Sequence, residues 1–168
     1  MNLRAVVMLL ACAGGVVGCG GPVRQGATPD RPPAPVSQVD VVAAEAVPMA
    51  VNWDERPGPD GVRIRVTLFQ RAQPRPVVGS GTLDFLLFPG KVGDVDPATA
   101  RPAQSWTFAC AELRPSLVRS IVGWGYSLSL GWGDRMPDSP TVTVFVRYAA
   151  PGGEPVWSKP VTIAISLQ

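Results

Sequence analysis

Proline and glycine limit the fold of this chain more than any other feature. Together they occupy 37 of its 168 positions. Proline fixes φ and removes a backbone donor, and glycine loses conformational entropy inside helices and strands. Because one of them recurs every few residues, long helices are excluded and short strands joined by turns are favoured. Hydrophobic residues still make up 46% of the chain, which is enough for one packed core.

A period of two in the apolar residues predicts about seven short strands. The alternation is clearest over 62–69, where aliphatic residues alternate with Arg63, Arg65 and Thr67. The same pattern predicts strands over 82–88, 106–110, 126–131, 141–148 and 161–167, and an opening strand over 50–53. The stretch 36–47 is consistent with either a first strand or a short helix.

Turn-forming residues separate these segments. The sequences at 57–61 (PGPDG) and 151–153 (PGG) combine a fixed φ with residues that accept a positive φ, and both predict antiparallel hairpins. The stretch 89–102 is too polar for a strand and is expected to be a surface loop. Residues 111–122 allow one short helical turn, whose length Pro115 limits.

These elements predict an all-β fold, a single antiparallel β-sandwich of about seven strands over residues 36–168. A small closed barrel is the alternative. The pattern resembles immunoglobulin-like and transthyretin-like sandwiches. A true antibody-type domain is not supported, because no pair of cysteines is placed to join the two sheets.

The N-terminus has the pattern of a processing signal. A cationic start at Arg4 precedes the uncharged run 5–18, which is too short for a stable membrane-spanning helix. The run ends in Val16-Val17-Gly18-Cys19, which resembles the lipobox of bacterial lipoproteins. The resemblance implies a signal peptide over 1–18, which is removed, and a thioether-linked diacylglycerol on Cys19. An ordinary signal peptide with a chance cysteine is the alternative. The proline-rich stretch 19–35 is expected to be a disordered tether.

The combination of sequence features in this chain is similar to that of small lipoproteins of GC-rich bacteria. Besides the lipobox and the tether, they include two Trp-Gly pairs, at Trp124 and Trp132, and a C-terminal hairpin. The resemblance implies a location and a shape, and it implies no chemistry.

The residue types that most enzymes need are scarce. The sequence has no histidine, which excludes Ser-His and Cys-His pairs and imidazole metal ligands. Once Cys12 leaves with the signal and Cys19 carries lipid, only Cys110 remains, so no intrachain disulfide is expected. We interpret Cys110 as a buried, inert thiol, because no base is available to activate it. No cofactor motif is present.

The acidic and basic residues suggest alternative sites for binding or catalysis. Asp94 and Asp96 are interpreted as solvated loop residues. The alternatives are a carboxylate pair for acid–base catalysis, with each other or with Asp84, and a Ca²⁺ site formed by their oxygens. Arg63 and Arg65, with Arg147, are expected on a solvated outer face, where anionic headgroups or glycan carboxylates are the alternative ligands. The net charge is +2 and the basic residues are not clustered, so nucleic acid is not expected as a partner.

Three aromatic residues are the candidate recognition site. Trp124, Tyr126 and Trp132 lie at the two ends of one predicted strand, and exposed rings there would stack on sugars. Packing in the core or at its rim is the preferred interpretation.

The sequence therefore predicts a non-catalytic lipoprotein of the cell envelope that binds another envelope protein or has a structural role. It would be anchored in the membrane, facing the periplasm or the outside. Because Gly20 rather than Asp follows Cys19, an outer membrane is its expected location where the host has one. The alternative function is a carbohydrate- or peptidoglycan-binding module that uses Trp124, Tyr126 and Trp132.

Overall fold

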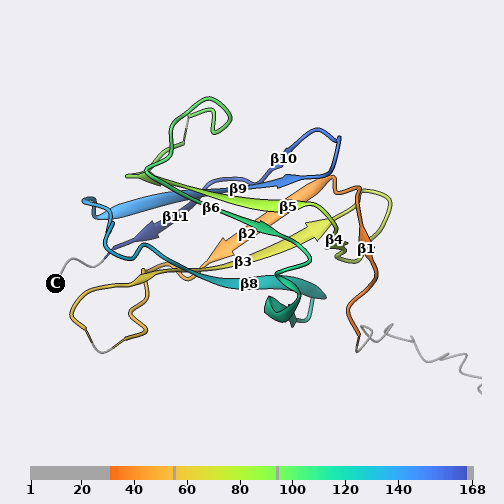
Figure 1. Cartoon of the computed structure of the whole chain (residues 1–168), viewed down its shortest axis with the longest axis horizontal. Helices are drawn as coiled ribbons and strands as arrows, with labels where there is room; N and C mark the ends of the chain where they lie inside the picture. Colours follow the sequence, from red (N-terminus) through yellow and green to blue (C-terminus); the bar gives the residue numbers. More distant parts are fainter. Residues whose placement is uncertain (1–30, 55, 94, 166–168) are drawn as a thin grey trace, which may run out of the picture.

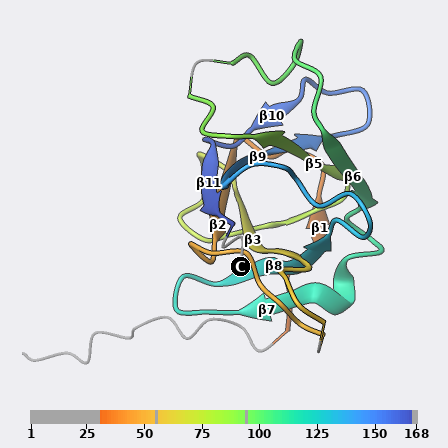
Figure 2. The ribbon, with the colours of Figure 1, turned by 90° about the vertical axis from the view of Figure 1, so that its left-hand side faces the viewer.

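The computed structural model describes residues 31–54, 56–93 and 95–165, which form two antiparallel sheets packed face to face (Figures 1 and 2). The first sheet has the order β2 (Val41–Ala46), β3 (Gly61–Phe69), β8 (Trp124–Gly131) and β7 (Leu117–Arg119). The second has the order β10 (Val156–Trp157), β9 (Thr141–Ala149), β5 (Thr82–Pro89) and β6 (Gln104–Ala109), with β11 (Val161–Ala164) also paired to β9. The predicted all-β antiparallel sandwich is confirmed.

Three short elements lie outside these two sheets. β1 (Pro35–Val36) pairs in parallel with β4 (Val78–Gly79), which follows the loop after β3. A single 3₁₀ turn, η1 (Arg114–Ser116), precedes β7 and is the short helical turn that the sequence predicted. The ambiguous stretch 36–47 contains the end of β1 and the whole of β2, and no helix.

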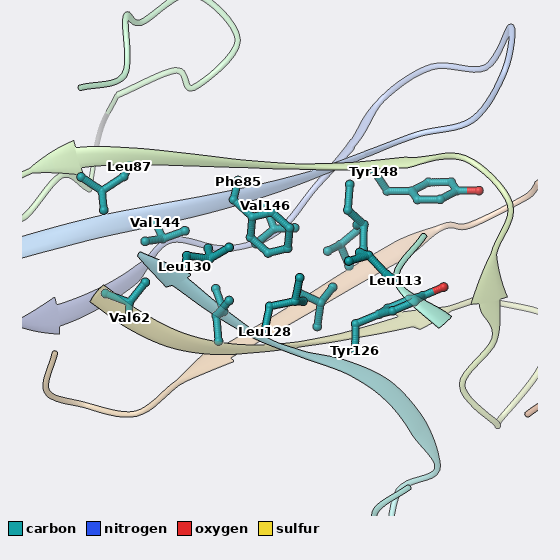
Figure 3. Packing of buried hydrophobic residues seen from close by; sticks show 14 of the residues in the cluster. Val62, Phe85, Leu87, Leu113, Tyr126, Leu128, Leu130, Val144, Val146 and Tyr148 are labelled. Atoms are coloured by element: carbon teal, nitrogen blue, oxygen red, sulfur yellow. The ribbon is translucent and has the colours of Figure 1, made fainter. Parts of the chain in front are cut away.

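The core fills the space between the sheets, as Figure 3 shows. Alternate residues of each strand point inward, and each fully buried aliphatic or aromatic side chain contributes about 1.5–3 kcal/mol relative to exposure. The inward residues of three long strands are Val62, Ile64, Val66 and Leu68 on β3, Leu83, Phe85 and Leu87 on β5, and Val142, Val144, Val146 and Tyr148 on β9. The residues that the sequence pattern places on one face of each of these strands therefore share the inward face in the structure.

The predicted opening strand over 50–53 is wrong. Only Val51 makes a bridge there, to Gly61. The side chains of Asn52 and Asp60 capture nearby backbone groups instead, since Asn52 donates to two carbonyls and Asp60 accepts from the Trp53 amide. Polar side chains that bind the local backbone in this way compete with strand pairing.

Just before residues 50–53, the chain passes from the edge of the first sheet to the edge of the second. β2 ends at Ala46, and the Pro48 carbonyl then accepts a hydrogen bond from the amide of Ala164 on β11. The amide of Ala50 returns a bond to the carbonyl of the same residue. Residues 48–50 therefore join the edges of the two sheets on one side of the sandwich.

The loop over 90–102 covers part of the outer face of the second sheet. The Val92 amide donates to Thr143 Oγ1, whose hydroxyl donates to the Gly90 carbonyl. On this outer face, Phe88 and Phe145 are buried and pack edge to face with ring centroids 5.8 Å apart. The expected surface loop thus also shields a small second apolar cluster.

Candidate functional site

The proposed lipid attachment site lies outside the described residues. Cys19, the expected signal peptide over 1–18 and the expected tether as far as residue 30 all fall in that part of the chain. The end of the tether is described, and it differs from the expectation. Pro33 and Ala34 line a groove, and Pro35 already belongs to β1, so the domain begins before residue 36.

The three candidate rings do not form one exposed surface. Tyr126 is 0% exposed, Trp132 is 3% exposed and Trp124 is half-buried. Residues 124, 126, 128 and 130 share the inward face of β8, and Trp132 follows the strand at its far end. Its indole Nε1 donates to the Pro59 carbonyl at 2.8 Å. Packing in the core is confirmed for Tyr126 and Trp132, and a sugar-stacking platform made of all three rings is wrong.

Two buried tyrosines organise the end of the core near β1 (Figure 3). Tyr126 Oη accepts a hydrogen bond from the Gly79 amide, and Tyr148 Oη accepts one from the Gly81 amide, each at 3.2 Å. Tyr148 also donates to the Ser37 carbonyl at 2.9 Å. A side chain at Gly79 would place a Cβ 2.6 Å from the Tyr148 ring, so this close approach requires glycine. The tyrosines therefore fix the β4 segment and the entry of the chain into the domain.

Cys110 lies beside this pair and is buried. Burial raises the pKa of its thiol to about 11, although a hydrogen bond with Tyr126 acts in the opposite direction. Burial also raises the pKa of Tyr126 and of Tyr148, and the neighbouring Cys110 adds to both shifts. All three groups are protonated at neutral pH, which agrees with the interpretation of Cys110 as an inert thiol.

Tyr148→Phe is expected to lower the free energy of unfolding by about 1–3 kcal/mol, because it leaves the Gly81 amide and the Ser37 carbonyl without this partner. It should also speed amide exchange of Ser80, which donates to the Val36 carbonyl. Urea unfolding and hydrogen exchange check both effects. Tyr126→Phe is the matched control, because Tyr126 Oη accepts from the Gly79 amide, whereas Tyr148 Oη donates to the backbone carbonyls at residues 36 and 37. Unchanged exchange at Ser80 in Tyr148→Phe would contradict the prediction.

A polar cluster on the outer face of the second sheet was not foreseen. Asp84 is buried, and it accepts hydrogen bonds from Arg147 Nε at 2.9 Å and from Thr107 Oγ1 at 2.6 Å. The Arg147 guanidinium also lies 5.5 Å from the centroid of the Trp157 ring. The charges pair because β5 and β9 bring residues 84 and 147 into register.

The predicted basic face is therefore divided. Arg63 and Arg65 lie on β3 in the first sheet, whereas Arg147 lies on β9 in the second and is bound to Asp84. No single outer face contains all three.

The acidic residues of the loop over 90–102 are an alternative site that the sequence suggests, and local structure accounts for Asp96. Asp96 accepts from the Ala98 amide and from the Thr99 hydroxyl, so its carboxylate caps a turn of the loop, while Asp94 lies outside the described residues. Among the described residues, no three His, Cys, Asp or Glu side chains form a group that could hold a metal ion.

An apolar groove lies at the end of the sandwich where β7 and β8 meet. It has a volume of about 440 Å³ and is lined by residues from 33–36, 73–77 and 121–124, including Trp124. Sequence reasoning missed this site, because it assigned residues 111–122 to a helical turn and not to a hairpin. The signal that would have found it is the Ile121-Val122 pair between Ser120 and Gly123.

A second hollow, of about 500 Å³, lies between residues 102–105 and 131–135. Polar groups dominate it, and Gln104 Oε1 is a buried atom there without a hydrogen-bond partner. Because the hollow is open to solvent, it does not define a ligand.

No protein-family model, no curated protein and no solved structure matches this chain. Within the part that the structure describes, no helix is both long and apolar enough to cross a membrane.

Proposed function

We propose that this protein is a lipid-anchored, non-catalytic domain of the bacterial cell envelope. Cys19 would carry the diacylglyceryl anchor, and the β-sandwich would bind another envelope protein or have a structural role at the membrane. The observation that carries the proposal is the Val16-Val17-Gly18-Cys19 motif at the end of an uncharged run. Twelve positions after Cys19, at Arg31, the described part of the chain begins and leads directly into β1. Gly20 favours the outer membrane where the host has one.

The order of the strands supports an immunoglobulin-like classification within this proposal. The first sheet has the strand order β2-β3-β8-β7, and the second has the order β10-β9-β5-β6, with β11 also paired to β9. This order supports the classification, because immunoglobulin-like sandwiches join strands A, B, E and D in one sheet and C, F and G in the other, and here β8 lies between β3 and β7 as strand E lies between B and D. Many cell-surface domains with this architecture are binding modules, which favours a protein partner.

The state of Cys110 supports a non-catalytic role. A nucleophilic cysteine needs a lowered pKa and access to substrate, whereas this thiol is buried and its pKa is raised to about 11. Two of the three rings that the sugar-binding alternative needs, those of Tyr126 and Trp132, are buried in the core. That function is therefore not proposed.

Cys19→Ala is expected to abolish incorporation of a fatty-acid analogue and to release the domain from the membrane fraction. The thioether bond needs the sulfur of residue 19, and the anchor contributes about 0.8 kcal/mol per buried CH₂. Metabolic labelling followed by membrane flotation of the full-length chain measures both effects. Cys12→Ala is the matched control, since it changes the same residue type within the apolar run, and it should label and float as the wild type does. Persistent labelling of Cys19→Ala would refute the anchor.

A further inference from the structure

The turn between β7 and β8 exposes two aliphatic side chains. Ile121 is 101% exposed and Val122 is 58% exposed. The backbone amides of Ser120 and Gly123 each donate a hydrogen bond to the other residue's carbonyl. Ile121 and Val122, which lie between them, therefore form the tip of the turn. Tight turns of this kind are usually built from glycine, asparagine, aspartate and serine. Local folding therefore does not account for an Ile-Val pair at this position.

The packing behind the tip holds it in place. Gly123 has a φ of 128° and lies against Pro76, which a Cβ would approach to 2.9 Å. Trp124, Pro33 and Val77 extend the apolar surface from the tip into the groove. The exposed aliphatic pair is thus part of a continuous apolar surface with an indole ring at its side.

Arg75 lines the groove, and the sequence segments that form the groove are rich in arginine. The three segments that meet there, 31–37, 71–77 and 113–126, contain five arginines and no acidic residue: Arg31, Arg71, Arg75, Arg114 and Arg119. Three acidic residues, Asp30, Asp40 and Glu112, lie next to these segments in the sequence or through a hydrogen bond. The loops at the opposite ends of β3 and β8, residues 52–60 and 132–140, carry five acidic residues and two arginines. The domain therefore has a basic, apolar end and an acidic end.

The chain enters the domain at the basic end. Pro33 and Val36 line the same groove as Ile121 and Trp124, and Figure 1 shows β1 at the same end of the sandwich as the start of β8. Only 14 positions separate Pro33 from Cys19. A chain of that length spans at most about 50 Å. A lipid on Cys19 would therefore keep this end of the domain close to the bilayer.

We propose that the tip and its groove contact the surface of an anionic phospholipid bilayer. Ile121 and Val122 enter the headgroup layer beside the Trp124 ring, and the arginines bind lipid phosphates. Aromatic rings and long basic side chains are suited to this interface because each has an apolar body and a polar end. The contact rests on the proposed Cys19 anchor for its strength. A short linker gives a tethered site an effective concentration in the millimolar range, so a contact too weak to bind alone still orients the domain.

Photocrosslinking of the full-length chain tests this contact. Protein carrying p-benzoylphenylalanine in place of Ile121 is purified in detergent and reconstituted into vesicles. One set contains phosphatidylcholine alone, and the other contains phosphatidylcholine with about 30% phosphatidylglycerol. Flotation reports the anchor, whereas phospholipid attached to the peptide that contains position 121 reports the contact. The same probe in place of Met136, an exposed residue of the opposite loop, is the control for position.

We expect phospholipid adducts at position 121, with at least fivefold fewer at position 136, and more adducts in the anionic vesicles. With the probe at 121, Arg75→Gln should reduce adducts in the anionic vesicles about fivefold, because one basic residue near such a surface contributes about that factor. Arg135→Gln, at the other end, should change nothing. Equal adducts at 121 and 136, or no effect of phosphatidylglycerol, would overturn the contact even where flotation confirms the anchor. If flotation fails but position 121 still labels selectively, the anchor is refuted and the contact stands.

Discussion

Trp132→Ala is expected to lower the free energy of unfolding by about 3–5 kcal/mol, the usual cost of truncating a large aromatic side chain in a core. Trp132 is buried within the main cluster, and its indole nitrogen donates to the Pro59 carbonyl. The truncation leaves both a cavity and a carbonyl without its donor. Since whole domains are stable by about 5–15 kcal/mol, this one change removes a large share of the total.

Trp124→Ala is the matched comparison and should cost less than about 2 kcal/mol, because Trp124 is half-buried at the rim of the groove. Trp132→Phe keeps most of the apolar volume and should lose mainly the hydrogen bond, about 1 kcal/mol. Urea unfolding of the four proteins gives the comparison. Equal losses for Trp124→Ala and Trp132→Ala would contradict the different positions of the two rings.

The domain is also expected to lose stability steeply above pH 9. The pKa of Cys110 is raised from 9.0 to about 11 by burial, so the folded state holds this proton after the unfolded chain has released it. The contribution is fully present below about pH 9 and is lost as the pH rises to about 11. At about 1.4 kcal/mol per pH unit, the loss reaches about 2–3 kcal/mol. The raised pKa values of Tyr126 and Tyr148 continue the trend above pH 10.

Urea unfolding at pH 7.5, 9, 10 and 10.5 measures this loss. Cys110→Ala should be less stable than the wild type at neutral pH, because it leaves a small cavity, but its stability should change little between pH 9 and 10. Above pH 10 both proteins should weaken together, since the tyrosines remain. Parallel curves for the two proteins from pH 7.5 to 10 would show that the thiol is not the source of the pH dependence.

Strand alternation explains why the fold class was predictable. Along β3 and β9, every second residue is apolar, and a period of two is typical of a strand. The same reasoning fails for β7, whose three residues are too few to show a period and become a strand only through pairing with β8. It also fails at 50–53, where asparagine and aspartate side chains outcompete the sheet for the backbone.

The candidate site was only partly predictable for a related reason. The inward position of Tyr126 follows from its shared parity with Leu128 and Leu130, which the sequence displays. The Asp84–Arg147 pair depends on which strands are neighbours and in what register, and alternation within each strand carries no such information. The groove depends on three segments far apart in the chain. A sequence pattern therefore predicts which residues share a face of one strand. It does not predict a site formed by several segments, because that depends on how the strands are ordered and paired.

The short β1–β4 pair gives the domain a defined mechanical response. Tension that arrives along the chain from the N-terminal side is first carried by two residue pairs and by the hydrogen bond from Tyr148 to the Ser37 carbonyl. The load next reaches the hydrogen bonds that hold residues 38–40 to residues 69–71, and only then β2, which is held to β3 by six residue pairs along the edge of the first sheet. β1 therefore acts as a weak link in series with the sandwich, so that a pull on the chain extends the entry segment before it disturbs the core.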